Sequence, residues 1–173
     1  NTTPDTLEFV FSTTNTNQNQ KLVENSGSSA LQATASLQVL SGTPSDFDGK
    51  IISISSSDGT GKTYIFDDDN DGATGTLDGS GRVRIQINGK TNSDEIATEI
   101  SKSISSANGH RNKIKADDFQ SFLTNTSQNF ITSDGKTLLA NFSGSIHLTQ
   151  LTASVAGNNL ITTNAPSMSV SGF

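Results

Sequence analysis

The chain has 173 residues, no cysteine and a formal net charge of −6. This acidic balance opposes a general attraction to nucleic acids or anionic membranes. Without cysteine the chain has no thiol for redox chemistry or thiolate metal ligands. No apolar run approaches the roughly 20 residues that span a bilayer, so neither a membrane nor a nucleic acid is an expected partner.

Small hydrogen-bonding residues dominate the composition: 26 Ser, 22 Thr and 16 Asn, together 64 of the 173 residues. Leu, Ile, Val and Phe contribute 40 residues, just above the level at which chains usually stay disordered, so a modest core is expected. Charged residues make up only 16%. A neutral polar surface of this kind is typical of many extracellular, fibre and virion β-proteins.

Residues 1–29 are predicted to form an extended arm with one strand at its start. The arm continues into a polar stretch that has nothing to bury. Leu7, Phe9 and Phe11 are the candidate interface residues, because aromatic side chains dominate interface energetics and an arm can add a strand to a neighbour's sheet. The alternative is that this strand folds back on the chain's own core.

Residues 30–173 are predicted to form a single β-rich domain. Most of its segments alternate apolar and polar residues, the pattern of strands with one buried face. The expected strands are 31–40, 51–54, 63–66, 82–88, 113–116, 145–151, 160–163 and 168–170. The Asp58-Gly59 step predicts a hairpin between the second and third, because glycine supplies the positive φ of a tight turn. The alternation assigns Arg82, Arg84 and Gln86 to solvent.

One helix is predicted near 92–108. Asn92 can cap its N-terminus while Glu95 reaches back in a capping box. Its apolar stripe at helical spacing consists of Ile96, Ala97, Ile100, Ile104 and Ala107. Asn108-Gly109 is expected to end the helix through a left-handed cap. The predicted class is α+β, mostly β: an antiparallel sheet or sandwich with one amphipathic helix packed on it.

The acidic loop that begins at Asp67 is the sharpest local signal for a ligand. Calcium takes several hard oxygens from one short loop, and the loop matches calcium-loop positions 1, 3, 5 and 12, with Gly72 at position 6. The candidate calcium ligands are Asp67, Asp69, Asp71 and Asp78. No other cofactor is indicated. Position 12 carries Asp rather than Glu and strands flank the loop, so the alternative is a solvated acidic turn.

No catalytic residues are indicated, and we expect a protein without enzymatic activity. Gly61-Lys62-Thr63 matches only the end of a phosphate-binding loop and continues into a strand rather than a helix. The sequence has no nucleophile elbow. His110 follows the predicted helix and His147 lies on the outward phase of a strand, so neither suggests a site.

A series of short motifs follows one another through the predicted β-rich domain. They are Ile52-Ser53-Ile54, DGTGKTYIF at 58–66, GATG at 72–75, DGSG at 78–81, 83–87, 94–97, ISSANGH at 104–110, 113–114, 148–158 and 161–162. With these motifs, the segment from Phe47 to Thr163 resembles a module that recurs in structural proteins of marine bacteriophages and other aquatic viruses. That module has a strand reading DGT-K-Y-F, a GATGT-DGSG loop, a helix ending I-SANGH and a strand and loop reading LTQ-TAGAAGN-IT.

The resemblance implies a place in the virion, as a capsid decoration (cement) protein that stabilises or decorates the shell. Its expected partners are the major capsid protein, other virion proteins and further copies of itself, with a trimer as the state suggested by analogy. A tail or head-fibre module that binds a host surface or carbohydrate, with calcium in the acidic loop, is the alternative. The resemblance carries over no catalytic residue.

Two regions depart from the viral module. The segment near 117–143 is longer than the corresponding link, and an inserted hairpin is expected there. Residues 1–42 have no counterpart in the module.

Overall fold

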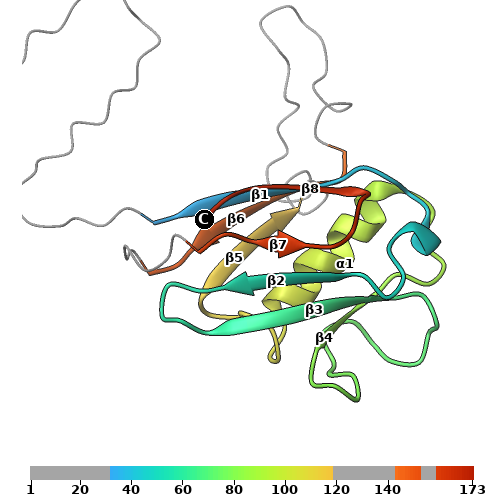
Figure 1. Ribbon diagram of the computed structural model, residues 1–173, viewed down its shortest axis with the longest axis horizontal. Helices are drawn as coiled ribbons and strands as arrows, with labels where there is room; N and C mark the ends of the chain where they lie inside the picture. The colour runs from blue at the N-terminus through green and yellow to red at the C-terminus, as the bar shows by residue number, and fades with distance from the viewer. Residues whose placement is uncertain (1–31, 119–142, 153–158) are drawn as a thin grey trace, which may run out of the picture.

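The computed structural model describes residues 32–118, 143–152 and 159–173. Within these ranges the chain is mostly β, with two four-stranded sheets and one α-helix (Figure 1). The predicted α+β class, a sandwich with one packed helix, is therefore confirmed.

Two predictions concern residues outside the described ranges. The predicted arm 1–29, with the candidate interface residues Leu7, Phe9 and Phe11, is one of them. The hairpin near 117–143 is the other, apart from the two residues at its start and the one at its end. Both stay predictions.

The first sheet has the strand order β5-β6-β1-β8, and all its neighbouring strands are antiparallel. Its strands are β1 (Thr34–Val39), β5 (Ile114–Asp118), β6 (Ser145–Gln150) and β8 (Met168–Gly172). The second sheet has the order β4-β3-β2-β7. Its strands are β2 (Ile51–Ser55), β3 (Gly61–Asp67), β4 (Val83–Gln86) and β7 (Thr162–Thr163). Each of the eight predicted strands corresponds to one of these.

The strands β3 and β4 run parallel, although an antiparallel arrangement was expected. The cause is the path of the connection between them, which first runs back along the outer edge of β4. The Gly75 N–H donates to the carbonyl of Arg84, and the Arg84 N–H donates to the carbonyl of Thr76, both at 2.8 Å. The chain then turns and enters β4 between this segment and β3.

The helix α1 (Ser93–Ser105) closes the side of the sandwich between β5 and β4 (Figure 1). Four residues of its predicted apolar stripe, Ile96, Ala97, Ile100 and Ile104, join both sheets in a single cluster of buried side chains. The fifth, Ala107, lies beyond the end of the helix and is exposed, so its assignment to the stripe is wrong. Ser101 Oγ donates to the carbonyl of Ala116 on β5 at 2.9 Å, and Ser103 Oγ donates to the carbonyl of Arg84 on β4 at 2.8 Å. The two buried serines thus fasten the helix to one strand of each sheet.

The start of α1 is close to its prediction. The side chain of Asn92 accepts the Glu95 N–H at 2.9 Å. The Glu95 carboxylate accepts the Thr91 N–H at 2.7 Å, one residue before the donor that a capping box uses.

A short 3-10 helix, Pro44–Asp46, links β1 to β2.

The predicted left-handed cap at the end of α1 is wrong. The helix ends at Ser105, and its C-cap Ser106 is extended, with φ −70° and ψ 166°. Gly109 has no positive φ. Glycine is required at this position because it has no Cβ, which lets the backbone of residue 109 pack directly against the last turn of α1. A Cβ there would lie 2.3 Å from the carbonyl oxygen of Ser103 and 2.6 Å from that of Ile104.

Candidate functional site

The acidic loop surrounds Arg84, which the alternation had assigned to solvent. Arg84 Nε lies 2.8 Å from Asp67 Oδ2, and Nη2 lies 3.0 Å from Asp71 Oδ1. The Arg84 side chain is only 16% exposed, so the assignment to solvent is wrong. Arg82 pairs with Asp78 at 2.7 Å. The two arginines of this segment therefore bind three of the four candidate calcium ligands.

The four candidate ligands do line one hollow, of about 210 Å³, together with Asp48 and the two arginines. Two of them also organise the backbone of the loop. Asp67 Oδ1 accepts the Asp69 N–H at 3.0 Å, and Asp78 Oδ1 accepts the N–H groups of Ser80 and Arg82 at 2.9 and 2.7 Å. Within the described ranges, no three Asp, Glu or His side chains are placed to share a metal ion.

Local contacts lower the pKa of Asp78. Desolvation acts to raise the pKa of Asp78, but hydrogen bonds from Arg82 and Ser80 outweigh it and hold the pKa below its ordinary value. The acidic spacing in the sequence thus corresponds to turns and ion pairs. An incoming cation would have to displace arginine from Asp67, Asp71 or Asp78.

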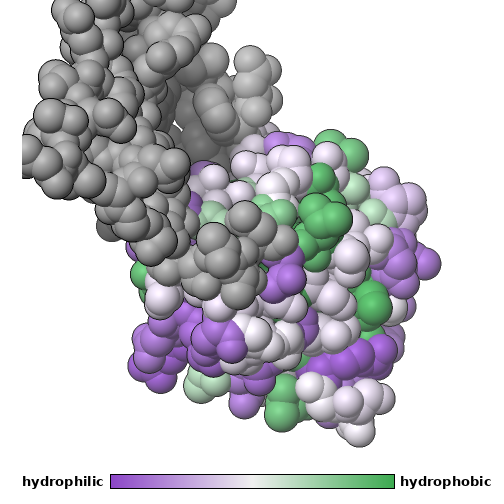
Figure 2. Space-filling model, turned by 60° about the vertical axis from the view of Figure 1, so that its left-hand side comes forward, coloured by the Kyte–Doolittle hydropathy of each residue, from purple (hydrophilic) through white to green (hydrophobic). Residues whose placement is uncertain are grey.

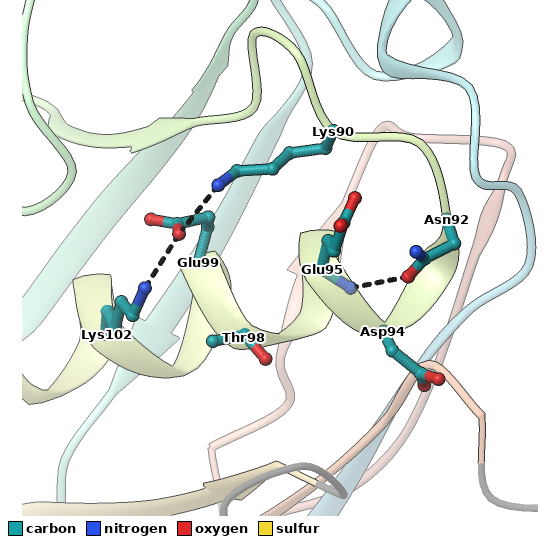
Figure 3. Close-up of a pocket in the computed structure, with 7 residues that line it drawn as sticks. All are labelled: Lys90, Asn92, Asp94, Glu95, Thr98, Glu99 and Lys102. Carbon is teal, nitrogen blue, oxygen red and sulfur yellow. Dashed lines mark hydrogen bonds and ion pairs between the residues drawn. The ribbon is translucent and has the colours of Figure 1, made fainter.

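A second hollow, of about 430 Å³, lies beside the first turns of α1 (Figure 3). Glu99, which lines it, is only 7% exposed. Its carboxylate lies 3.1 Å from Lys90 Nζ and 2.9 Å from Lys102 Nζ, and it accepts a hydrogen bond from Thr74 Oγ1 at 2.6 Å. Desolvation acts to raise the pKa of Glu99, but these contacts outweigh it and lower the pKa. Both lysines that line this hollow therefore pair with the same carboxylate, that of Glu99.

His110 and Tyr64 form a buried pair at the end of the β2–β3 hairpin, for which no spacing in the sequence gave a signal. His110 Nδ1 lies 2.6 Å from Tyr64 Oη, and Nε2 lies 3.1 Å from the carbonyl oxygen of Thr60. Because a carbonyl only accepts, Nε2 carries the hydrogen and Nδ1 accepts from the tyrosine hydroxyl. Burial lowers the pKa of His110 and raises that of Tyr64. The ring is completely buried, which suits a structural role.

Lys113 binds the same hairpin from outside. Its Nζ lies 2.6 Å from Asp58 Oδ2 and also contacts Thr60 Oγ1. Lys113 holds the pKa of Asp58 well below its usual range. The hairpin is thereby fastened to the segment that follows α1.

Acid is expected to destabilise the protein through His110 before its carboxylates titrate. The folded state holds the pKa of His110 below its ordinary 6.5 because of burial. The hydrogen bond to the Thr60 carbonyl and the charge of Asp58 oppose this effect, while Lys62 and Lys113 add to it. Below pH 6.5 the unfolded chain therefore binds more protons, and stability falls by up to about 1.4 kcal/mol per pH unit. Urea unfolding at several values between pH 7.5 and 5.0 measures this slope.

The matched variant is His110→Gln, whose amide can still donate to the carbonyl of Thr60. We expect its stability to be nearly independent of pH over the same window. The shifted carboxylates have ordinary values of 3.8 to 4.5 and contribute only at lower pH. Equal slopes for the variant and the wild type would contradict the assignment.

The first sheet presents a neutral surface, which we call the neutral face. Its outward side chains on β1, β6 and β8 are Thr34, Ser36, Gln38, Ser145, His147, Thr149, Ser169 and Ser171. The strands β1, β6, β7 and β8 contain no Asp, Glu, Lys or Arg, and the sequence has none from residue 137 to 173. The sequence signal for the neutral face is this uncharged run, which becomes visible only when several strands are considered together.

The outer edge of β8 borders the neutral face and has no neighbouring strand among the described residues, and we call it the open edge of β8. The outer edge of β4 is covered by the acidic loop, and that of β5 by α1 and the segment after it, where the Ile114 N–H donates to the carbonyl of His110 at 3.0 Å. The strand β7 has only two residues. No hydrogen bond joins β8 to a further strand among the described residues.

The visible surface agrees with this composition. Figure 2 shows mainly pale residues of intermediate hydropathy between separate purple and green groups. Over residues 32–118, 143–152 and 159–173, four large apolar side chains are exposed, namely Leu40, Leu77, Leu151 and Leu160. In the part of the chain that the structure describes, no helix is both long and apolar enough to cross a membrane.

Comparison with known proteins adds no family. No protein-family model matches the chain, and no curated protein matches it.

Proposed function

We propose that this protein is a virion structural protein, and specifically a capsid decoration protein that binds the shell through protein–protein contacts. The observation that carries the proposal is the neutral face together with the open edge of β8. The resemblance of the segment from Phe47 to Thr163 to viral modules supports the virion as the proposed location.

The open edge of β8 supports this proposal, because proteins usually protect the edge strands of their sheets from pairing with other chains. An exposed edge offers unpaired backbone groups, and charged residues, proline or a covering segment normally prevent pairing with another chain. The sequence of β8, from Met168 to Gly172, has no charge and no proline. An edge of this kind suits the addition of a strand from a partner.

The neutral face supports the proposal in a second way. Ser, Thr and Gln side chains can hydrogen-bond to a partner in either direction, as donor or acceptor. Contacts made by neutral groups depend less on salt than contacts between charges do. Such a face can therefore bind another protein despite the net charge of −6.

Analysis of purified particles tests this function. We expect mass spectrometry to find the chain in particles purified by density gradient, enriched over an abundant host protein that serves as the control. Extraction under mild denaturation is expected to release it before the major capsid protein. Its absence from purified particles would refute the proposal.

The acidic hollow favours one second candidate, a tail or head-fibre module that binds a host surface or carbohydrate with calcium. This function requires that millimolar calcium raise the Tm, since a ligand that prefers the folded state stabilises it. The rise must disappear in Asp71→Asn, and glycan-array binding must be lost on chelation. An unchanged Tm would refute the calcium-site hypothesis, because it would mean that calcium does not displace Arg82 and Arg84 from their ion pairs with the aspartates.

A further inference from the structure

We propose that the outer edge of β8 pairs antiparallel with β8 of a second copy, around a two-fold axis at Val170. The pairing would join two first sheets into one continuous sheet of eight strands, with the two neutral faces on the same side. The inference rests on the proposed function, since it names the first partner of that surface.

The hydrogen bonds between β1 and β8 decide which backbone groups point outward. The Leu40 N–H donates to the carbonyl of Ser167 at 2.9 Å, and the Phe173 N–H donates to that of Thr34 at 3.2 Å. Bonding alternates along an antiparallel pair. The residues of β8 that direct their backbone groups away from β1 are therefore Met168, Val170 and Gly172.

These outward groups are self-complementary. With Val170 opposite the second copy's Val170, each N–H of this pair reaches the other carbonyl. The Gly172 N–H then faces the carbonyl of Met168 in the other copy, and the reverse. The Met168 N–H is not needed, because it already donates to the carbonyl of Ala165 at 3.2 Å. Four hydrogen bonds form, and the interface is isologous, as closed two-fold dimers require.

Charge favours a second copy as the occupant. Each copy carries a net charge of −6, so a surface for self-association must keep its charges at a distance. The strands β8, β1 and β6 carry none, and the first charged pair on this sheet is Lys115–Asp117 on β5, at the opposite edge. Two copies joined at β8 therefore meet through strands of the first sheet that carry no charge.

Cysteine cross-linking tests the register, since the chain has no cysteine of its own. In this register Ser169 faces the second copy's Ser171, in a non-hydrogen-bonded pair with Cα atoms about 4.5 Å apart, within the range of a disulfide. Both side chains are exposed, so Ser169→Cys and Ser171→Cys change the fold little. The full chain is used, with a size tag on one variant.

We expect an equal mixture of the two variants to form a disulfide-linked heterodimer about tenfold more readily than either variant forms a homodimer. Ser169 and its own copy across the axis are offset diagonally by about 7–8 Å, beyond the reach of a disulfide. Ser105→Cys, at the exposed end of α1, reports random collisions. Equal yields in all samples, or no cross-link above this control, would overturn the proposal.

A second arm of the experiment addresses the competing occupant and the function. A disulfide between Ser171→Cys and either Phe9→Cys or Val10→Cys, both in the strand predicted at the start of the arm, would assign the edge to the arm and overturn the dimer. If the heterodimer fails to form in a protein found in particles, the dimer is wrong and the proposed function stands. If the heterodimer forms but the chain is absent from particles, the dimer stands and the proposed function is wrong.

Discussion

Replacement of Gly109 by alanine is expected to lower the free energy of unfolding by about 3 kcal/mol, the upper end of the usual effect of overpacking. The new Cβ would meet the carbonyl oxygens of Ser103 and Ile104 at 2.3 and 2.6 Å. Both are backbone atoms of the last helical turn, which cannot rotate away. The backbone must shift instead and weaken the 2.7 Å hydrogen bond from the His110 N–H to the carbonyl of Ile104. Urea unfolding at pH 7.5 measures the loss.

Gly79→Ala is the matched control for this substitution. Nothing lies within 4 Å of a Cβ at Gly79, and the residue has no positive φ. Its unfolding free energy is expected to stay within about 0.5 kcal/mol of the wild type, as for surface substitutions in general. Similar values for both alanine variants would show that the close approach at Gly109 does not constrain the fold.

Replacement of Arg84 by methionine is expected to cost about 2 kcal/mol. Methionine preserves the apolar stem but removes the guanidinium from Asp67 and Asp71. The side chain of Asp67 is only 11% exposed, so its carboxylate would lose its cation in a poorly hydrated place. Loss of one partner from a fully buried pair costs 3–5 kcal/mol, and the partial exposure of Arg84 reduces that figure.

The control for Arg84→Met is Lys115→Met, which removes an ion pair with Asp117 on the solvent face of β5. Both of its side chains are more than a third exposed, and an exposed pair contributes at most about 1 kcal/mol. Urea unfolding of the two variants gives the comparison. An Arg84→Met variant no less stable than Lys115→Met would mean that the ion pairs of the acidic loop contribute little to stability.

Some parts of the candidate site could be predicted from local pattern and others could not. The alternation in the segment around β4 correctly assigned Val83, Ile85 and Ile87 to the core. It misplaced Arg84, because an outward phase leads to solvent only where no other segment covers that face. The acidic loop folds back over β4, and its aspartates meet the arginine there. The residues of β4 alone do not predict that the preceding loop covers its outward face.

The buried pair of His110 and Tyr64 illustrates the same limit at long range. These residues are 46 positions apart, and no periodicity links them. The hairpin that holds Tyr64 and the turn after α1 that holds His110 meet only when the two sheets share one core. A buried histidine with both nitrogens bonded is therefore a property of the packing.

The sequence by itself determined the eight strands, the hairpin at Asp58-Gly59 and the start of α1 at Asn92, because alternation, turn chemistry and capping act between residues a few positions apart. The tertiary structure alone decided the parallel pairing of β3 with β4, the close approach at Gly109 and the open edge of β8. These features depend on which segments lie side by side. That choice is made by burial of a common core and by backbone hydrogen bonding between distant strands, which no local pattern encodes.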